Sequence, residues 1–225
     1  MSGRTRKAMK ALEPQQARSR ESLRKLLQAA AEVMGQHGLE GATIPRIARH
    51  AGLTPGSVYR RFHDKEALFE AAILEILERQ DEQMRTGMTP LIATPIPLAA
   101  FVDQAITGMV VTYRAKAPLL RAMRQFVHNR TGTPFGRKVT ALDLRYFKRV
   151  VDVFMTHRDE IRHPQPRLAV SFAIKMVVGT LFQLVVLPTD MSAWRGLLPK
   201  DDHALKQELT RAFLNYLDVA KTSKT

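Results

Sequence analysis

The sequence predicts an all-α protein built from two helical domains. Apolar residues recur at three- and four-residue spacing along most of the chain, as in helices with one buried face. No segment alternates between apolar and polar residues as a half-buried strand would, and no internal repeat appears. A length of 225 residues accommodates two modest domains. We therefore expect a three-helix domain with a helix-turn-helix over residues 18–66 and a larger helical domain over residues 67–225.

The composition indicates a globular protein that favours polyanions as partners. The hydrophobic fraction is 45%, which is enough for a core, and the absence of cysteine suits the cytoplasm. The net charge is +14, and residues 1–65 hold 13 Lys and Arg against 5 Asp and Glu. A solvated basic surface would explain a surplus of this kind. Its concentration around a helix-turn-helix makes DNA the better explanation.

Residues 1–17 carry basic side chains with little apolar periodicity, so we expect a flexible basic arm. A signal peptide is not expected because the long apolar stretch that one needs is missing. Such an arm can lie in a DNA minor groove, although a disordered tail is the simpler interpretation.

The first helix should begin at Ser19 or Ser22 and end at Gly38. Between these positions one apolar stripe follows the helical period and comprises Leu23, Leu26, Leu27, Ala30, Val33 and Met34. This stripe should cover the back of the helix-turn-helix.

The stretch from Thr43 to Lys65 predicts two short helices joined by a tight turn. Thr43 is a good N-cap, and Gly52 tolerates the left-handed backbone of a turn. Thr54 then caps a second helix that has Pro55 at its first position, where a missing N–H does no harm. Hydroxyls, a tyrosine and two arginines occupy the outer face of this second helix. They suit phosphates and base edges rather than a core.

The segment from Arg18 to Ala72 resembles the N-terminal domain of TetR-family (tetracycline-repressor-like) transcriptional regulators. The resemblance rests on Ile-Ala before the turn glycine and on Ser-Val-Tyr-x-x-Phe followed by Asp-Lys-Glu-Ala-Leu. Beyond this segment, only length, helical content and domain order agree. The resemblance implies a homodimer that binds a palindromic operator in double-stranded DNA, since one helix contacts only a few base pairs.

The resemblance also implies roles for individual residues. Those expected to contact DNA are Thr43, Arg46, Thr54, Pro55, Gly56, Ser57, Tyr59, Arg61 and Lys65, to which geometry alone adds Arg60. Arg61 is the candidate for bidentate pairing to guanine, while the alternative is that Arg60 and Arg61 only neutralise phosphates. Gly56 departs from the expected pattern, because it has no side chain that could read a base.

The larger domain should begin with a helix over Ala67–Gln83, followed by a Pro-rich break at 86–97 and further amphipathic stripes on either side of Pro118. The segment 167–187 is apolar enough to suggest a transmembrane helix, but Lys175 and Gln183 interrupt it. We therefore expect no membrane, and a helix that is buried on several sides or lies in a dimer interface. The resemblance implies that 167–187 and a last helix over 203–220 pair with their copies; the alternative is that they only complete the monomer core.

Most of the phenylalanines and methionines lie in this larger domain, as a ligand cavity or an ordinary core would require. The resemblance favours a small, largely apolar effector that tilts the fourth helix and releases a repressor from its operator. The side chains expected to line its cavity are Phe101, Met109, Tyr113, Phe126, Phe147, Phe154 and Phe172.

Neither catalysis nor a metal or other cofactor is expected. His157, Asp159, Glu160 and His163 lie close in the sequence, but their spacing fits no known zinc pattern, and a solvated helix end explains them better. Nucleophile elbows and phosphate loops are missing in the context they need. The alternative function is a helical protein that binds acidic partners or membrane surfaces through its charge.

Overall fold

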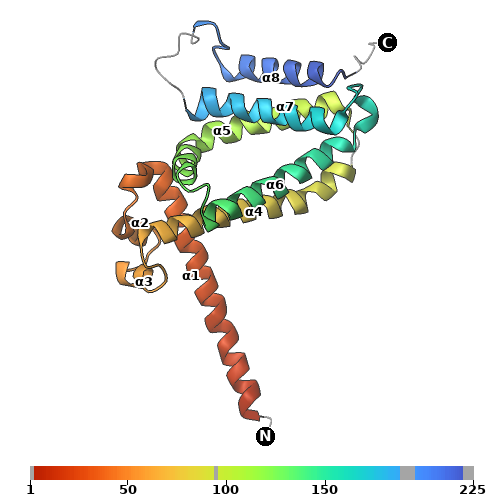
Figure 1. Cartoon of the computed structure of the whole chain (residues 1–225). Coiled ribbons are helices and arrows are strands. Elements are labelled where there is room, and N and C mark those ends of the chain that lie inside the picture. The colour runs from red at the N-terminus through yellow and green to blue at the C-terminus, as the bar shows by residue number, and fades with distance from the viewer. Residues whose placement is uncertain (1–2, 94–95, 188–195, 220–225) are drawn as a thin grey trace. The chain divides into compact units, whose positions relative to one another are not determined.

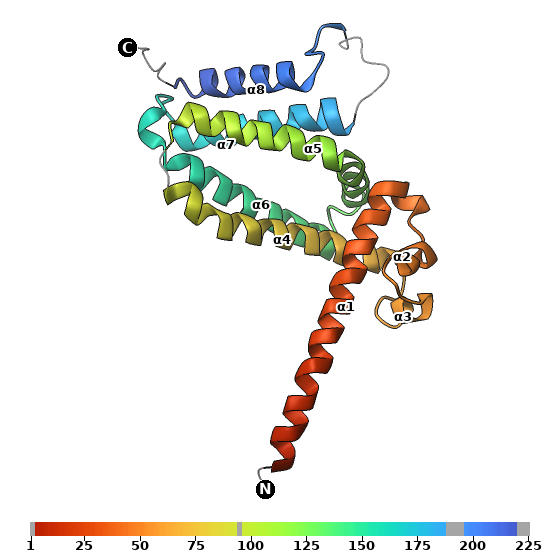
Figure 2. The same cartoon turned by 180° about the vertical axis from the view of Figure 1, so that it is seen from behind.

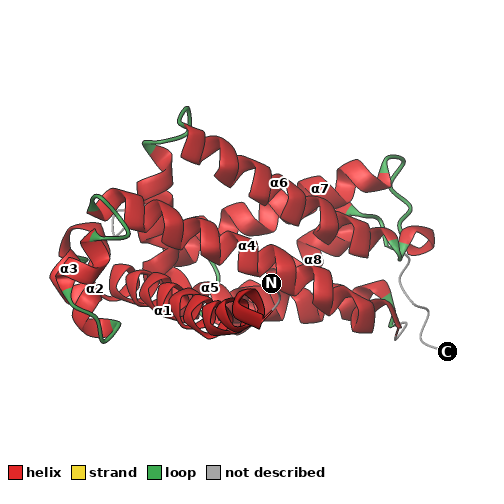
Figure 3. Ribbon diagram, turned by 90° about the horizontal axis from the view of Figure 1, so that it is seen from below, coloured by secondary structure: helices red, strands yellow, loops and turns green. Residues whose placement is uncertain are grey.

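The computed structural model describes residues 3–93, 96–187 and 196–219, with side chains outside 3–17 and 88–93 (Figure 1). Every regular element in these ranges is a helix, as Figure 3 shows by colour, and a single isolated bridge joins Ile161 to Val219. The prediction of an all-α fold is therefore confirmed. The chain divides into two compact units, Met1–Ile76 and Leu77–Thr225.

The first unit comprises α1 (Gly3–Gly41), α2 (Ile44–His50), α3 (Pro55–Tyr59) and the first turns of α4 (Lys65–Ala93). Its core is formed by side chains with almost no exposed surface, namely Leu26, Ala30, Met34, Ile47, Ala48, Val58, Leu68, Phe69 and Ile73. The units meet at residues 76 and 77 rather than at the predicted 66 and 67, because Leu68, Phe69 and Ile73 of α4 pack into the first unit.

Helix α1 differs from the sequence prediction at its start and agrees with it at its end. The helix begins at Gly3, well before Ser19 or Ser22, and so includes most of the arm that we expected over residues 1–17. These residues are rich in Ala, Lys, Arg, Gln and Met, which have high helix propensity. Flexibility of residues 1–17 stays a prediction. Gly38 has the left-handed φ of 67° that interrupts the helix where the sequence placed its end.

The second unit continues with α5 (Leu98–His128), α6 (Pro134–Met155), the short η1 (Arg158–Glu160), α7 (Pro166–Leu181), the π-helical η2 (Phe182–Val186) and α8 (Asp202–Tyr216). Figures 1 and 2 show α8 running along α5 and α7. Two helices are longer than expected. The exposed Pro118 lies inside α5 without ending it, and α4 continues to Ala93 through part of the predicted break.

The core of the second unit is formed mainly by α5, α7 and α8. Its most buried members include Leu98, Val102, Ile106, Ala169, Val170, Ala173, Val177, Leu181, Leu205 and Leu217. Residues Pro166–Val186 are long and apolar enough to span a membrane by length and composition alone. In this fold one side of that segment is buried in the core. The other side exposes Leu168 and Phe172, which are 60% and 51% accessible.

A buried carboxylate joins α4 to α6, which run side by side in Figures 1 and 2. Asp81 of α4 is only 5% exposed, the one charged residue so deeply buried among the described side chains. Its two oxygens accept hydrogen bonds from Arg145 Nε at 2.6 Å and from Arg149 Nε at 3.0 Å. The two arginines lie four residues apart on α6, so one face of that helix holds the carboxylate.

The acidic end of the loop after α6 caps α5. The Glu160 carboxylate accepts the Leu98 backbone N–H at 2.9 Å and lies 3.1 Å from His157 Nδ1. These contacts give His157 and Glu160 a structural role, and both belong to the His–Asp–Glu group that the sequence had placed at a helix end. No cluster able to hold a metal ion occurs among the residues that the structure describes.

Candidate nucleic-acid interface and cavity

The helix-turn-helix is built by local hydrogen bonds that the sequence prescribes. Gly52 adopts φ 68°, the left-handed turn conformation. Thr54 accepts the Ser57 backbone N–H at 3.3 Å, while the Ser57 hydroxyl donates to the Thr54 carbonyl at 2.7 Å. The predicted Thr54 cap is therefore confirmed. Thr43 occupies the N-cap position of α2, but its side chain makes no capping bond, so that part of the prediction is wrong.

The ten residues that the sequence proposed for DNA contact all lie in the first unit, and none of them is buried. Val58 is fully buried beneath α3, whereas Tyr59 on the same short helix is 55% exposed. Of the ten, Ser57 and Lys65 are partly exposed, and the others are exposed, namely Thr43, Arg46, Thr54, Pro55, Gly56, Tyr59, Arg60 and Arg61. A Cβ at Gly56 would meet nothing within 4 Å. The backbone of α3 is thus accessible at Gly56.

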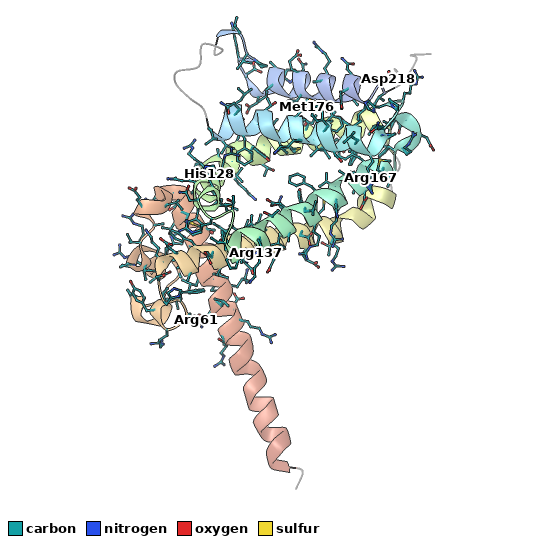
Figure 4. All side chains as sticks on the ribbon, in the orientation of Figure 1. Arg61, His128, Arg137, Arg167, Met176 and Asp218 are labelled. Atoms are coloured by element: carbon teal, nitrogen blue, oxygen red, sulfur yellow. The ribbon has the colours of Figure 1, made fainter. Side chains whose placement is uncertain are left out.

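The sequence suggested that Arg61 projects from α3, but neither Arg60 nor Arg61 lies within this helix. The helix ends at Tyr59, and Arg60 is its C-cap, because the recognition segment is only five residues long. Arg61, labelled in Figure 4, lies in the connection to α4. Its guanidinium donates to the Ser19 carbonyl of α1 at 3.3 Å. Both arginines therefore follow the C-terminal end of α3.

Two further cations among the ten residues are held by the protein backbone in the same way as Arg61. The Arg46 guanidinium donates to the Gly41 carbonyl. The Lys65 ammonium donates to the Leu39 carbonyl at 3.2 Å and lies 5.6 Å from the centre of the Phe69 ring. These bonds restrict the side chains before any partner is bound, and a phosphate would have to compete with a carbonyl for each of them.

The second unit contains a cavity of about 780 Å³ between α6 and α7. Helix α6 contributes Asp143, Leu144, Phe147, Lys148, Val151 and Asp152, and α7 contributes Arg167, Ser171, Ile174, Lys175 and Val178. Arg167, at the N-terminal end of α7 in Figure 4, forms an ion pair with Asp152. The volume lies in the range that small-molecule sites occupy, and the lining combines apolar and charged groups.

Models of protein families match both units of this chain. Residues 26–72 match the bacterial regulatory proteins of the TetR family, and residues 97–217 match the tetracyclin repressor-like C-terminal domain. The second match alone covers more than half of the chain. The chain belongs to the TetR family. The resemblance seen in the helix-turn-helix therefore extends to residues 97–217 of the second unit, and regulators of this family bind DNA, dimerise and bind small molecules.

Curated relatives of this TetR-family chain are transcriptional regulators. The HTH-type transcriptional regulator UidR of Escherichia coli K12 is 31% identical over 38% of this chain, and the match spans 40% of UidR. The HTH-type transcriptional repressor KstR2 of Mycolicibacterium smegmatis is 32% identical over 56% of this chain and 63% of its own length. The matches therefore span less than two thirds of the length of each of these two relatives.

Solved structures confirm the TetR fold. A putative TetR-family transcriptional regulator from Mesorhizobium loti superimposes with a TM-score of 0.65, covering 88% of this chain and 97% of its own. Its sequence identity is 20%, so this likeness concerns the fold.

Five of the seven residues predicted to contact an effector in this TetR-family chain belong to the core of the second unit or pack against it, namely Phe101, Met109, Tyr113, Phe147 and Phe154. Effector binding by the seven stays a prediction. Of the seven, Phe147 lines the α6–α7 cavity. Phe101 and Phe154 pack edge to face in the core, and Phe126 packs on Phe135. Met109 lies partly buried against the core, Tyr113 contacts Phe182, and Phe172 is half exposed beside Tyr216.

The sequence analysis missed the charged lining of the cavity, namely Asp143, Lys148, Asp152, Arg167 and Lys175. It concentrated on aromatic and Met side chains, which also build ordinary cores. Burial raises the pKa of the Asp143 carboxyl, although its side chain is reachable from the cavity. Burial, with Tyr146 and Asp143 nearby, raises the pKa of Tyr113 to about 12.

Proposed function

We propose that this protein is a cytoplasmic repressor that binds a palindromic operator as a homodimer and is released by a small effector. The observation that carries the proposal is the exposed tip of α3, surrounded by cations, on a chain that matches TetR-family models in both units. The net charge of +14 supports binding to a polyanion.

In this proposal α3 enters the major groove of the duplex. The short side chains at its tip and the bare backbone of Gly56 allow close approach to base edges. Tyr59, Arg46 and Lys65 contact phosphates on either side and set the register. Arg61 pairs with a guanine or neutralises a phosphate, and its position beyond the end of α3 leaves both roles open.

Dimerisation is proposed through the outer faces of α7 and α8. Leu168 and Phe172 lie one turn apart on α7 and are more than half exposed, which leaves an apolar row uncovered in the single chain. A Cβ at Gly179, further along this helix, would meet nothing within 4 Å, so a second backbone can approach there. The inner faces of both helices also complete the monomer core.

The effector is proposed to occupy the cavity between α6 and α7. Helix α6 is bonded through Arg145 and Arg149 to Asp81 of α4. A ligand that moves α6 would therefore also act on α4, which begins beside the helix-turn-helix in the first unit. Differential affinity for the two positions of α4 would supply the coupling free energy.

The test begins with footprinting of the DNA that flanks the gene, with an excess of competitor duplex. We expect two protected half-sites about one helical turn or more apart. Uniform protection that disappears on adding competitor would refute the repressor and support the nonspecific polycation instead.

Two variants then separate base reading from phosphate binding. Arg61→Ala should reduce discrimination at one symmetric base pair by about 1–3 kcal/mol, while Lys65→Ala should weaken all sequences alike. Arg137→Ala is the matched control, since Arg137 also donates to a backbone carbonyl, that of Gly132, but lies in the second unit. If Arg61→Ala lowers every affinity equally, the arginine binds phosphate only.

A further inference from the structure

The lining of the α6–α7 cavity combines apolar and charged side chains. Five aliphatic and aromatic side chains line it, namely Leu144, Phe147, Val151, Ile174 and Val178. They come from both helices, so an apolar body inserted there loses water on two sides. An occupant with a substantial apolar part is therefore favoured.

The charges of the lining do not cancel. Arg167 and Asp152 form an ion pair with each other. Lys148 on α6 and Lys175 on α7 make no hydrogen bond or ion pair with any other residue that the structure describes. Both lysines are exposed and belong to the cavity lining. Helices α6 and α7 thus each contribute one lysine without an ion-pair partner to the lining.

The remaining charge in the lining, Asp143, does not neutralise the two lysines. It forms no ion pair within the described part of the chain, and burial raises the pKa of its carboxyl. The Asp143 carboxylate also contributes to the raised pKa of the Tyr113 phenol. The lining thus holds one carboxylate and two lysines without ion-pair partners, so a cationic ligand is less favoured here than an anionic one.

We infer that the α6–α7 cavity binds an amphiphilic anion, whose apolar chain packs on Phe147, Val151 and Ile174 and whose carboxylate or phosphate is bound by Lys148 and Lys175. This inference deepens the proposed function, because the anion would be the effector of the same cavity. It differs from the sequence-based expectation of a largely apolar effector by assigning the ligand a charged end.

The test is calorimetric titration of the purified full-length protein with four ten-carbon probes, below the concentrations at which they form micelles. Decanoate and decyl phosphate are the anions, decanol is the neutral analogue and decyltrimethylammonium is the cation. We expect both anions to bind about tenfold or more tightly than decanol, since one charged hydrogen bond is worth about 1.5–3 kcal/mol. Tighter binding of decanol or of the cation would overturn the inference.

Three variants locate the site. Lys148→Met and Lys175→Met should each weaken decanoate about tenfold and leave decanol unchanged. Lys138→Met is the matched control, because Lys138 is an exposed lysine on the same helix outside the cavity lining. Ser171→Trp should occupy part of the cavity and weaken the binding of every probe, with circular dichroism verifying the fold. If Lys138→Met weakens decanoate as much as Lys148→Met does, the anion responds only to overall charge and the inference fails.

Operator binding is measured separately by footprinting without any probe, so the two proposals can fail independently. Lysine-dependent binding of decanoate by a protein that protects no DNA would refute the repressor and keep the anion site. A protein that protects its operator but binds none of the four probes would keep the repressor and refute the anion site.

Discussion

Replacing Asp81, or replacing its partners Arg145 and Arg149, should destabilise the second unit, but by different amounts. Asp81 is 5% exposed, whereas the side chains of Arg145 and Arg149 are 54% and 32% exposed. Asp81→Asn removes the negative charge and one of the two acceptor oxygens, yet it leaves arginines that water can still reach. Each bond would be worth about 1.5–3 kcal/mol if it were buried, and partial exposure reduces this, so we expect a total loss of about 2–3 kcal/mol.

The converse change leaves a carboxylate buried without a partner. Arg145→Met together with Arg149→Met should lower the free energy of unfolding by about 3–5 kcal/mol, which exceeds the loss for Asp81→Asn. Adding Asp81→Leu to this double variant should restore part of the stability, because an apolar group then fills the site. Urea denaturation followed by circular dichroism measures all three proteins. A double variant that is more stable than Asp81→Asn would refute the reasoning, since it would mean that Asp81 is solvated.

Three further predictions concern single positions. Gly136→Ala should destabilise the fold by at least about 2 kcal/mol, because its Cβ would lie 2.1 Å from a backbone oxygen of the preceding loop. In the control Gly108→Ala the new Cβ meets nothing within 4 Å, so the free energy of unfolding should rise by about 0.5–1 kcal/mol. Thermal melts measure both variants. Glu160→Ala should lose about 1–2 kcal/mol by uncapping the Leu98 N–H, with Glu160→Gln retaining most of the stability as an acceptor. The pKa of Tyr113 is raised from 10.0 to about 12, so the folded state favours the neutral phenol. The wild type should therefore lose stability relative to Tyr113→Phe as the pH rises from 10 to 12. Equal dependence of the two stabilities on pH would contradict this.

The sequence could predict the features of the fold that depend on neighbouring residues. The turn glycine Gly52 and the Thr54–Pro55 restart act through bonds within a few residues, and both occur where the pattern indicated. The length of a helix was harder to predict. Pro118 is tolerated inside α5 on its exposed side, so proline chemistry alone suggested an interruption that does not occur.

Features formed by residues far apart in the chain could not be predicted from the sequence. Asp81 and Arg145 are 64 residues apart and have no local signature, and the two walls of the cavity come from separate helices. The same limitation explains why the sequence could not assign the seven expected effector-contacting residues to a core, a cavity or a surface. An apolar side chain at helical spacing is compatible with a core, a cavity or an exposed face, and Phe154, Phe147 and Phe172 now illustrate one of each.

Gly56 has a consequence for how this protein could acquire new DNA preferences. Its backbone is helical and does not require glycine, in contrast to Gly52 with its φ of 68°. A side chain there would extend into open space. If α3 enters the major groove as proposed, a side chain at position 56 could add a base contact without a change in the backbone. Variation at this position would then alter the DNA preference and leave the fold intact, a route by which duplicated regulators can diverge.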